Sequence, residues 1–375
     1  MADATRYRLA VIPGDGVGPE VTAAARHVLE TTAEAFGFGI DWTDVAAGGN
    51  AIDKFGVAIR PEDVVLCGEQ DAVLLGAVGG PHWDNPREPV RPEQALFTLR
   101  GTLGLFANLR PVMVYPQLVA ASPLKPDLLD GVDLLIVREL AGGIYFGERA
   151  EPSGDVGGRS ARDTLPYTEA EVRRIVRLGF ELAGSRRKRL TSVDKANVMA
   201  TSRLWRLVVE EAKADFPDVA VNHQLVDSAA MLLVRRPADF DVIVTENLFG
   251  DILSDEAAVL AGSLGMLPSA SLGTRQTEYG TFGLYEPIHG SAPDIAGRDI
   301  ANPLGTILSA AMLLRWSLGR EDAAEAVERA VARALDEGHR TADLAVAGPA
   351  VDLVGTQSMA QLVAERIETP ASVSA

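Results

Sequence analysis

Short apolar runs alternate with longer amphipathic stretches along much of the chain. The runs predict strands at residues 7–13, 71–78, 132–138, 190–193 and 241–245, with helical patterns between most of them. Short, continuous apolar runs are typical of strands buried on both faces, and their alternation with helices is typical of a parallel sheet covered by helices. We therefore expect an α/β fold.

Two helices are predicted in most detail. Over residues 169–184, Thr168 and Glu171 have the spacing of a capping box, and apolar residues recur with the helical period. A second helix is predicted from Pro303 to Leu318, with Asn302 as its cap and the proline in its first turn. Because it is apolar nearly all round, we expect it to be buried on several sides, within the chain or against another subunit.

Composition narrows the classes of function. The chain has 375 residues, and its 47% hydrophobic and 23% charged content is typical of a globular protein of one large domain or two. A net charge of −17 argues against nucleic acid and anionic membranes as partners. The single cysteine, Cys67, excludes an intramolecular disulfide and a cysteine-based metal site. With no signal peptide or long apolar run, we expect a cytoplasmic protein.

An acidic pair follows the last predicted strand. Asp251 and Asp255 are four residues apart, so they lie on one face of the first turns of a helix that begins near Asn247. Two like charges at about 4 Å repel by roughly 4 kcal/mol at an effective dielectric of about 20, and a divalent cation would reverse that sign. A solvated helix start is the alternative, because acids there favour the helix dipole. The preceding strand favours the metal site, with Asp227 as a third possible carboxylate.

A glycine cluster at residues 14–19 follows a strand and precedes a helix. Pro19 occupies the position of the third glycine in the dinucleotide-binding fingerprint, and no clear acidic strand end follows about 20 residues on. We therefore expect a tight strand-to-helix turn, with Pro19 at the first helical position, rather than a Rossmann phosphate loop.

Other polar residues have possible catalytic or binding roles. Arg100, Arg110 and Arg138 could bind a carboxylate with their planar forks, although each alone also fits an ordinary ion pair, and Arg138 stands out because it closes an apolar strand. Lys195 follows a strand and fits either a general base or a solvated turn lysine. Tyr145, near several glycines, fits a proton donor or a packing anchor. Residues 286–297 form a long loop whose glycines, histidine and aspartate indicate a ligand site, with the aspartate placed for a ribose diol.

Taken in order, these pieces resemble the isocitrate/isopropylmalate dehydrogenase family of metal-dependent β-decarboxylating hydroxyacid dehydrogenases, from Leu9 to about Leu362. The segments that carry the resemblance are VIPGDGVGPE (11–20), LGAVGGP (75–81), LFANLRP (105–111), RELAGGIYFGE (138–148), VDKANV (193–198), FGDILSD (249–255) and HGSAPDIAG (289–297). The LFANLRP and RELAGGIYFGE segments resemble the isopropylmalate branch specifically.

The resemblance implies an activity. It is the NAD-dependent oxidative decarboxylation of (2R,3S)-3-isopropylmalate to 4-methyl-2-oxopentanoate and CO₂, a step of leucine biosynthesis. The same chemistry on another malate-type acid, such as tartrate or homoisocitrate, is the alternative within the family. A non-catalytic regulatory or binding subunit is the alternative outside it, and the presence of the acid–base and metal residues argues against it.

The resemblance also implies residue roles. Arg100, Arg110 and Arg138 bind the substrate carboxylates, and Asp227 is a further substrate-binding residue. Asp227, Asp251 and Asp255 hold Mg²⁺ or Mn²⁺. Lys195 takes the hydroxyl proton as hydride leaves for the nicotinamide, and Tyr145 returns a proton to the enol after CO₂ departs. The pocket for the substrate side chain is formed by Glu93, Leu96, Phe97 and Val198, and Phe97 stands where a leucine often lines that pocket.

For the cofactor, the resemblance implies a site distinct from a Rossmann fold. Its residues are Asn197, Glu286, His289, Gly290, Ser291, Ala292, Pro293, Asp294, Ile295 and Asn302. The Asp294 carboxylate accepts hydrogen bonds from the adenosine ribose and repels a 2′-phosphate, so NAD is expected rather than NADP.

The resemblance finally implies an α/β architecture of two domains. Residues 1–105 with 262–375 form the first, which carries the cofactor loop, and residues 106–261 form the second, with an arm near 140–167 that joins two subunits. Lys195 and Asp227 are implied to reach into the partner's site, so a homodimer with shared active sites is expected.

Overall fold

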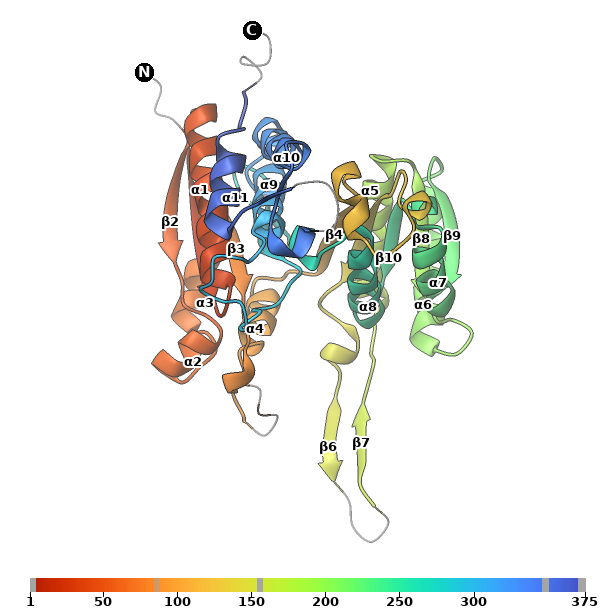
Figure 1. Cartoon of the computed structure of the whole chain (residues 1–375). Helices are drawn as coiled ribbons and strands as arrows, with labels where there is room; N and C mark the ends of the chain where they lie inside the picture. Colours follow the sequence, from red (N-terminus) through yellow and green to blue (C-terminus); the bar gives the residue numbers. More distant parts are fainter. Residues whose placement is uncertain (1–4, 84, 86–87, 154–157, 346–350, 370–375) are drawn as a thin grey trace. The chain divides into compact units, whose positions relative to one another are not determined.

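The computed structural model describes residues 5–83, 85, 88–153, 158–345 and 351–369. Contacts divide the chain into two compact units. Unit 1 consists of Met1–Leu105, Val114–Pro123 and Ala261–Ala375, and unit 2 of Phe106–Met113 and Leu124–Leu260. Each unit contains strands and helices that alternate along the chain, as Figure 1 shows, so the predicted α/β class is confirmed.

The strands of unit 1 lie in the order β2-β1-β3-β12-β11. Their bounds are β1 Arg6–Gly14, β2 Gly39–Asp44, β3 Ala72–Ala77, β11 Pro268–Gln276 and β12 Thr281–Pro287. Only the β11–β12 pair is antiparallel among the pairings within this group. The helices of the unit are α1 Gly18–Phe36, α2 Gly49–Phe55, α3 Pro61–Gly68, α4 Gln94–Thr102, α9 Leu304–Trp316, α10 Glu321–Asp336 and α11 Thr356–Ala364. Helix α9 packs against β11 and β12 and against its neighbours α1 and α10, which buries nearly all of its surface.

The strands of unit 2 lie in the order β4-β5-β10-β8-β9. Their bounds are β4 Ala107–Met113, β5 Asp133–Glu139, β8 Arg189–Asp194, β9 Ala220–Leu225 and β10 Val242–Thr245. All pair in parallel except β4 with β5. The helices are α5 Glu169–Gly184, α6 Ala200–Ala212, α7 Val226–Arg235 and α8 Asn247–Ala258. The carboxyl ends of β5, β10 and β8 therefore meet at one edge, where ligand sites form in such sheets.

The five predicted strands correspond to β1, β3, β5, β8 and β10, and helix α5 has the predicted bounds and capping box. The backbone N–H of Thr168 donates to Glu171 at 2.8 Å, and that of Glu171 donates to the Thr168 hydroxyl at 3.3 Å. The prediction for the 303–318 helix is wrong at both ends. Pro303, and not Asn302, is the N-cap of helix α9, which begins at Leu304 and ends at Trp316. The hydroxyl of the next residue, Ser317, donates to the Thr281 carbonyl at 2.7 Å.

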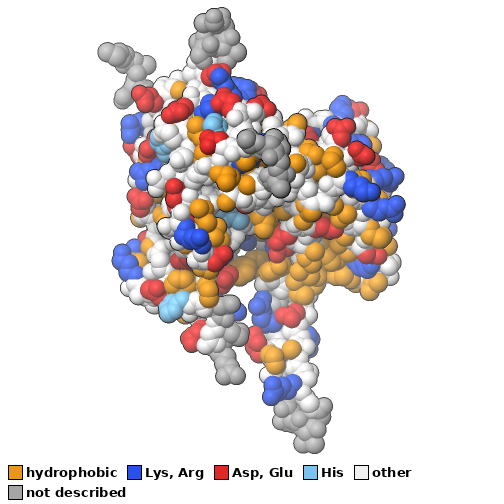
Figure 2. Space-filling view, viewed as in Figure 1, with side chains coloured by type: hydrophobic (Ala, Val, Ile, Leu, Met, Phe, Trp, Pro, Cys, Tyr) orange, Lys and Arg blue, Asp and Glu red, His pale blue; other side chains and the backbone are white. Residues whose placement is uncertain are grey.

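The polar segment after residue 148 is an exposed hairpin of strands β6 (Arg149–Ser153) and β7 (Ser160–Asp163). Every residue of these two strands is exposed, and the sequence of this segment did not indicate strands. Figure 1 shows the hairpin as a long arm, and Figure 2 shows that it carries side chains of both charges.

One stretch lies in a different unit from the one expected. Residues 114–123, expected in the second domain, pack with unit 1. Leu118 is buried there, and the Gln117 carbonyl accepts a hydrogen bond from Arg340 at 3.0 Å. The sequence around Leu118 has no periodicity that would indicate this return. Across the described ranges, the helices are too short or too polar to cross a membrane.

Candidate functional site

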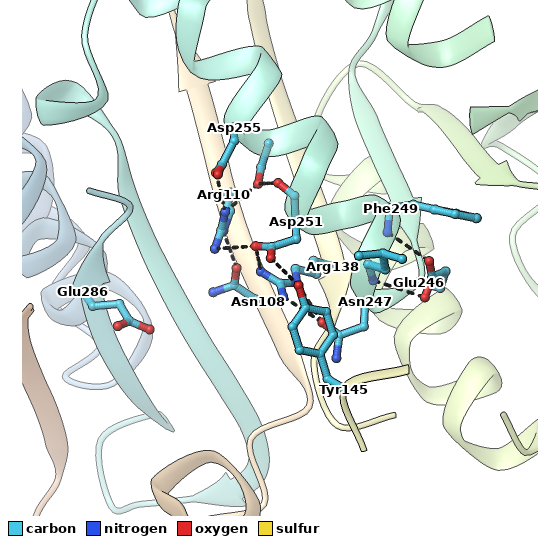
Figure 3. A network of polar contacts seen from close by, with 12 residues as sticks. Asn108, Arg110, Arg138, Tyr145, Glu246, Asn247, Phe249, Asp251, Asp255 and Glu286 are labelled. Atoms are coloured by element: carbon cyan, nitrogen blue, oxygen red, sulfur yellow. Dashed lines mark hydrogen bonds and ion pairs between the residues drawn. The ribbon is translucent and has the colours of Figure 1, made fainter. Parts of the chain in front are cut away.

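Two arginines and two aspartates of unit 2 form a compact cluster at the carboxyl ends of β5 and β10. Arg138 lies near the end of β5, in register with Thr245 at the end of β10. Helix α8 begins two residues after β10 and carries Asp251 and Asp255, as predicted, although Asp251 lies in its second turn and Asp255 in its last turn rather than in the first turns. Figure 3 shows these side chains pointing toward one another.

Arg138 is the most buried member, with 5% of its side chain exposed. Its Nε and Nη2 donate to the Asn247 side-chain oxygen at 3.0 and 2.8 Å, and its Nη1 bonds Asp251. The Asn247 amide nitrogen donates in turn to the Gly142 carbonyl at 3.0 Å. A Cβ on Gly250 would lie 2.6 Å from the Arg138 side chain, so the arginine needs a glycine there. A charge buried this deeply requires an opposite charge beside it, and Asp251 provides that charge for Arg138.

Arg110, from the antiparallel neighbour β4, forms the other half of the cluster. Its Nε donates to Asn108 at 2.7 Å, and its Nη1 donates to Ser254 at 2.5 Å and to Asp255 at 3.2 Å. Its Nη2 lies 3.6 Å from Asp251. Each aspartate therefore faces at least one guanidinium, and the cluster is balanced in charge.

Tyr145 contacts the same cluster through its hydroxyl, which donates to Asp251 at 2.7 Å. Burial, followed by this hydrogen bond, raises the pKa of the Tyr145 phenol to about 12. The phenol is therefore protonated near neutral pH. Burial also raises the pKa of Asp255, although Arg110 opposes the shift.

Three uncharged members of the cluster were not singled out from the sequence. They are Asn108, Asn247 and Ser254, all buried. Asn108 and Ser254 lie within segments that carry the resemblance, and Asn247 was named only as the start of a helix, because an amide or hydroxyl gives no signal in the charge pattern. Asn108 could have been found by strand periodicity, because it precedes Arg110 by two residues on the same face of β4.

Lys195 and Asp227 lie elsewhere in unit 2 and bond each other. Asp227 is in the first turn of α7, with 61% of its side chain exposed, and the bond from Lys195 lowers the pKa of this carboxyl. Within the described part of the chain, no three His, Cys, Asp or Glu side chains are grouped to hold a metal ion. A single chain thus brings together Asp251 and Asp255 but not Asp227. Asn197 and Val198 follow Lys195, and Val198 is 66% exposed.

Unit 1 carries the other residues assigned from the sequence. Arg100 on α4 donates to Glu286, at the end of β12, at 2.8 Å, and both side chains are nearly buried. Leu96 and Phe97 lie one turn earlier and Glu93, the N-cap of α4, lies two turns earlier, with Leu96 half-buried and the other two exposed. The spacing of Glu93, Leu96, Phe97 and Arg100 thus follows the helical period along one side of α4.

The loop after Glu286 is fixed by the first glycine turn. The Val17 N–H donates to the Ser291 carbonyl at 2.8 Å, and a Cβ on Gly16 would lie 1.9 Å from that oxygen. Gly16 has a φ of 58°, a left-handed conformation that favours glycine. The glycine cluster therefore forms a tight turn that holds the loop. Helix α1 begins one residue before Pro19, at Gly18.

Within this loop, desolvation lowers the pKa of His289, so its imidazole is neutral near pH 7. Gly290, Pro293 and Asp294 are exposed, and Ala292 and Ile295 are half-buried. Asn302 lies two residues before α9, and its side-chain oxygen accepts a hydrogen bond from the Leu304 N–H at 3.0 Å. An exposed aspartate on such a loop is suited to accept hydrogen bonds from a ligand's hydroxyls.

Comparison with known proteins identifies the family of the chain. The model of the isocitrate/isopropylmalate dehydrogenase family matches residues 8–363. A protein named 3-isopropylmalate dehydrogenase in Moorella thermoacetica is 57% identical over 364 residues, which cover 96% of this chain and 99% of that protein. Its namesake in Pseudomonas fluorescens is 54% identical, covering 95% of this chain and 97% of that protein.

Solved structures show the same fold. The crystal structure of isocitrate dehydrogenase from Methylococcus capsulatus matches with a TM-score of 0.83 at 34% identity, over 96% of this chain and 99% of that one. A β-decarboxylating dehydrogenase from Thermococcus kodakarensis matches with a TM-score of 0.75 at 38% identity, over 96% of each chain. The predicted fold class is confirmed, and the chain belongs to the isocitrate/isopropylmalate dehydrogenase family.

Proposed function

We propose that the chain catalyses the NAD-dependent oxidative decarboxylation of 3-isopropylmalate to 4-methyl-2-oxopentanoate and CO₂, within leucine biosynthesis. The observation that carries the proposal is the cluster in which Arg110 and Arg138 face Asp251 and Asp255, with the Tyr145 hydroxyl on Asp251. The names of the relatives at 54% and 57% identity support this substrate.

The charges of the cluster suit a dicarboxylate bound with a divalent cation. Two arginines and two aspartates compensate each other in the chain alone. A dianion and a divalent cation together add no net charge to the cluster. The substrate carboxylates can therefore pair with the guanidinium groups while the aspartates coordinate the cation. Arginine forks match carboxylates, and carboxylate oxygens suit Mg²⁺ or Mn²⁺. The ligands would be Asp251 and Asp255, with Asp227 of the partner subunit. When bound, the ion supplies Lewis-acid polarisation of the substrate oxygen.

Side chains of the protein itself carry out the proton transfers and hold the substrate. Lys195 would accept the hydroxyl proton as C2 is oxidised, and bound NAD would supply the hydride acceptor. The carbon–carbon bond to the departing carboxylate then breaks, its electron pair forms the enol, and Tyr145 donates a proton to the enol carbon. A phenol with a pKa of about 12 holds its proton until that carbanion-like carbon develops. Arg110 and Arg138 hold the carboxylates in place, together with Arg100.

For the cofactor, the proposal assigns NAD to the loop that contains His289 and Asp294. The exposed Asp294 carboxylate accepts from the ribose hydroxyls and repels an added phosphate. Phe97 and Leu96 on α4 would contact the isopropyl group, together with Glu93 and Val198.

A homodimer with shared sites is part of the proposal. Helices α7 and α8 are neighbours and expose three large apolar side chains, Met231, Val234 and Ile252, and Val259 directly after α8 is exposed as well. Figure 2 shows hydrophobic side chains gathered on unit 2 near the base of the β6–β7 arm. Contiguous apolar surface of this kind marks a protein interface. A second copy of the chain would cover it and bring Lys195 and Asp227 to the partner's cluster. We place the enzyme in the cytoplasm, where its one described cysteine, the buried Cys67, stays a thiol.

The test is a steady-state assay of NAD reduction with 3-isopropylmalate and Mg²⁺, run in parallel with isocitrate, homoisocitrate and tartrate. The proposal expects kcat/KM for 3-isopropylmalate to exceed that of each other acid by at least about ten-fold, because a misfitted side chain costs roughly 1–3 kcal/mol in an apolar pocket. A higher kcat/KM for any of the others would reassign the substrate.

A further inference from the structure

We propose that Tyr167 is a positioning residue that sets the geometry of Arg138 and of the turn that carries Tyr145. This inference rests on the proposed function, because its effect is read through substrate binding. Tyr167 lies between the β6–β7 arm and helix α5, outside every segment that carried the family resemblance.

The Tyr167 hydroxyl fixes Arg138 through one intermediate residue. It accepts a hydrogen bond from the Asn247 backbone N–H at 3.0 Å. The side-chain oxygen of Asn247 holds two nitrogens of the Arg138 guanidinium, at 3.0 and 2.8 Å. The position of the guanidinium therefore depends on where Asn247 lies, and Tyr167 contacts Asn247 at the first turn of α8.

The Tyr167 ring also supports the turn that precedes Tyr145. A Cβ on Gly142 would lie 2.8 Å from the ring, and one on Gly143 would lie 2.6 Å from its hydroxyl oxygen. The Gly143 N–H donates to the carbonyl of Pro166, the residue before Tyr167, at 3.2 Å. The short 3₁₀ turn Gly143–Tyr145 thus packs directly on the side chain of Tyr167.

Two buried carboxylates complete the surroundings of the hydroxyl. It lies 3.3 Å from Glu139 and 3.4 Å from Glu246. Glu139 accepts from the Ala141 and Gly142 N–H groups, at 3.0 and 2.8 Å, and so ties the end of β5 to the glycine turn. Glu246 accepts from the N–H groups of residues 248 and 249, at 3.2 and 2.9 Å, and so caps α8. The hydroxyl therefore joins the three backbone segments that carry Arg138, Tyr145 and Asp251.

These contacts explain why Tyr167 would affect substrate binding and turnover although it does not touch the substrate. Binding a dicarboxylate between two arginine forks requires both forks at hydrogen-bond distance, and a displacement of about 1 Å can cost on the order of 10²-fold in rate. Without the hydroxyl, the Asn247 N–H has no acceptor and the two carboxylates lose a shared partner. The first turn of α8 can then shift, and Arg138 shifts with it.

The test uses the full-length protein and the variant Tyr167→Phe, which keeps the ring. The matched control is Tyr285→Phe, in unit 1, where a fully buried tyrosine bonds Ser317 at 2.7 Å. Its side chain points to the opposite face of β12 from Glu286. Both variants lose one buried hydroxyl, so we expect both to lower the melting temperature.

Only Tyr167→Phe should weaken substrate binding. We expect the Kd of 3-isopropylmalate, measured by calorimetry with Mg²⁺ and without NAD, to rise by about ten-fold, the loss of one charge-assisted hydrogen bond. We expect kcat to fall as well, with the KM for NAD within about two-fold of wild type. In Tyr285→Phe, all three values should stay within about two-fold. A Tyr167→Phe protein that melts lower but keeps the wild-type Kd and kcat would overturn the inference.

A double-mutant cycle tests the route of the effect. Asn247→Ser removes the acceptor of the Arg138 guanidinium but keeps the backbone N–H. If Tyr167 acts through Asn247, the double variant Tyr167→Phe/Asn247→Ser should bind substrate within about two-fold of Asn247→Ser alone. If the losses of substrate affinity in the two single variants multiply in the double variant, Tyr167 acts on Arg138 by another route, and the inference is overturned. A wild-type protein inactive on 3-isopropylmalate would instead refute the proposed function, before any variant is compared.

Discussion

The variant Lys195→Met separates a catalytic lysine from a structural one. Methionine keeps the length and the apolar stem of the side chain and removes the charged nitrogen that bonds Asp227. If Lys195 accepts the hydroxyl proton, turnover should fall by 10² to 10⁴, the usual range for a positioned acid–base group. At about 1.36 kcal/mol for each factor of ten, this loss corresponds to about 2.7 to 5.5 kcal/mol of barrier.

The same substitution should change stability little. Asp227 has 61% of its side chain exposed, so water replaces the lysine around its carboxylate, and exposed ion pairs add little to folding. Lys213→Met is the matched control, because Lys213 lies 3.9 Å from Glu210 with about half of each side chain exposed. Both variants should melt near the wild-type temperature. Only Lys195→Met should lose turnover, and its KM for substrate should change less than its kcat.

Mixing variants tests whether the site is shared between subunits. Lys195→Met and Arg138→Ala are each expected to be inactive as homodimers. If Lys195 serves the partner's cluster, their heterodimer contains one site with both defects and one with neither, so it should approach half of the wild-type activity per dimer. The assay is NAD reduction after subunit exchange, with differently tagged chains to verify the heterodimer. A verified heterodimer that stays inactive would refute the shared site, and a Lys195→Met enzyme with wild-type kcat would refute the role of the lysine.

Three further expectations follow from the same residues. Removal of divalent cations with a chelator should abolish NAD reduction, and Asp251→Asn should lose turnover and Mg²⁺ affinity while it still melts cooperatively; full activity in chelator would contradict the metal assignment. The ratio of kcat/KM for NAD over NADP should be well above one and should fall in Asp294→Asn, so a ratio of one or less would contradict the loop assignment. Burial raises the pKa of Glu246, so its folded state favours the protonated carboxyl, and the resulting stabilisation is present below the unfolded pKa and is lost as pH rises through the folded value. Glu246→Gln mimics the protonated form, so its melting temperature relative to wild type should be higher at pH 8 than at pH 5; the reverse order would contradict the shift.

The elements that carry the charged site residues could be predicted because local sequence determines them. Strand β10 is a buried apolar run, and α8 begins directly after it with two acids four residues apart. Arg138 drew attention because it ends an apolar strand, and the structure confirms that it lies at the carboxyl edge of the sheet. Both patterns involve neighbours within one or two turns, which a periodicity argument can resolve.

Several partners of those residues could not be predicted, because they come from distant segments and carry no charge. Asn247 holds Arg138 from a position 109 residues away, and Ser254 holds Arg110 from 144 residues away. Tyr167 contacts Asn247, which is 80 residues away, through its hydroxyl. Every tyrosine has such a hydroxyl, so the sequence does not distinguish this one. Strands β9 and β4 were missed for a related reason: charged or polar residues such as His223 and Arg110 interrupt their apolar pattern. Residues 114–123 pack with unit 1 through Leu118, which gives no periodic signal.

The order of strands in unit 2 explains why these residues meet. Arg138, Thr245 and Val193 are in register across β5, β10 and β8, so the segments that follow each strand start from the same edge of the sheet. The turn after β5 leads to Tyr145, and the helix after β10 brings Asp251 to the same place. A chain with a net charge of −17 repels a dicarboxylate at long range. It can still bind one where two buried arginines are held by neutral amides, since Asn108 and Asn247 orient the guanidinium groups without cancelling their charge. The aspartates alone neutralise the arginines, and a divalent cation that bound these aspartates would leave the arginines for the substrate.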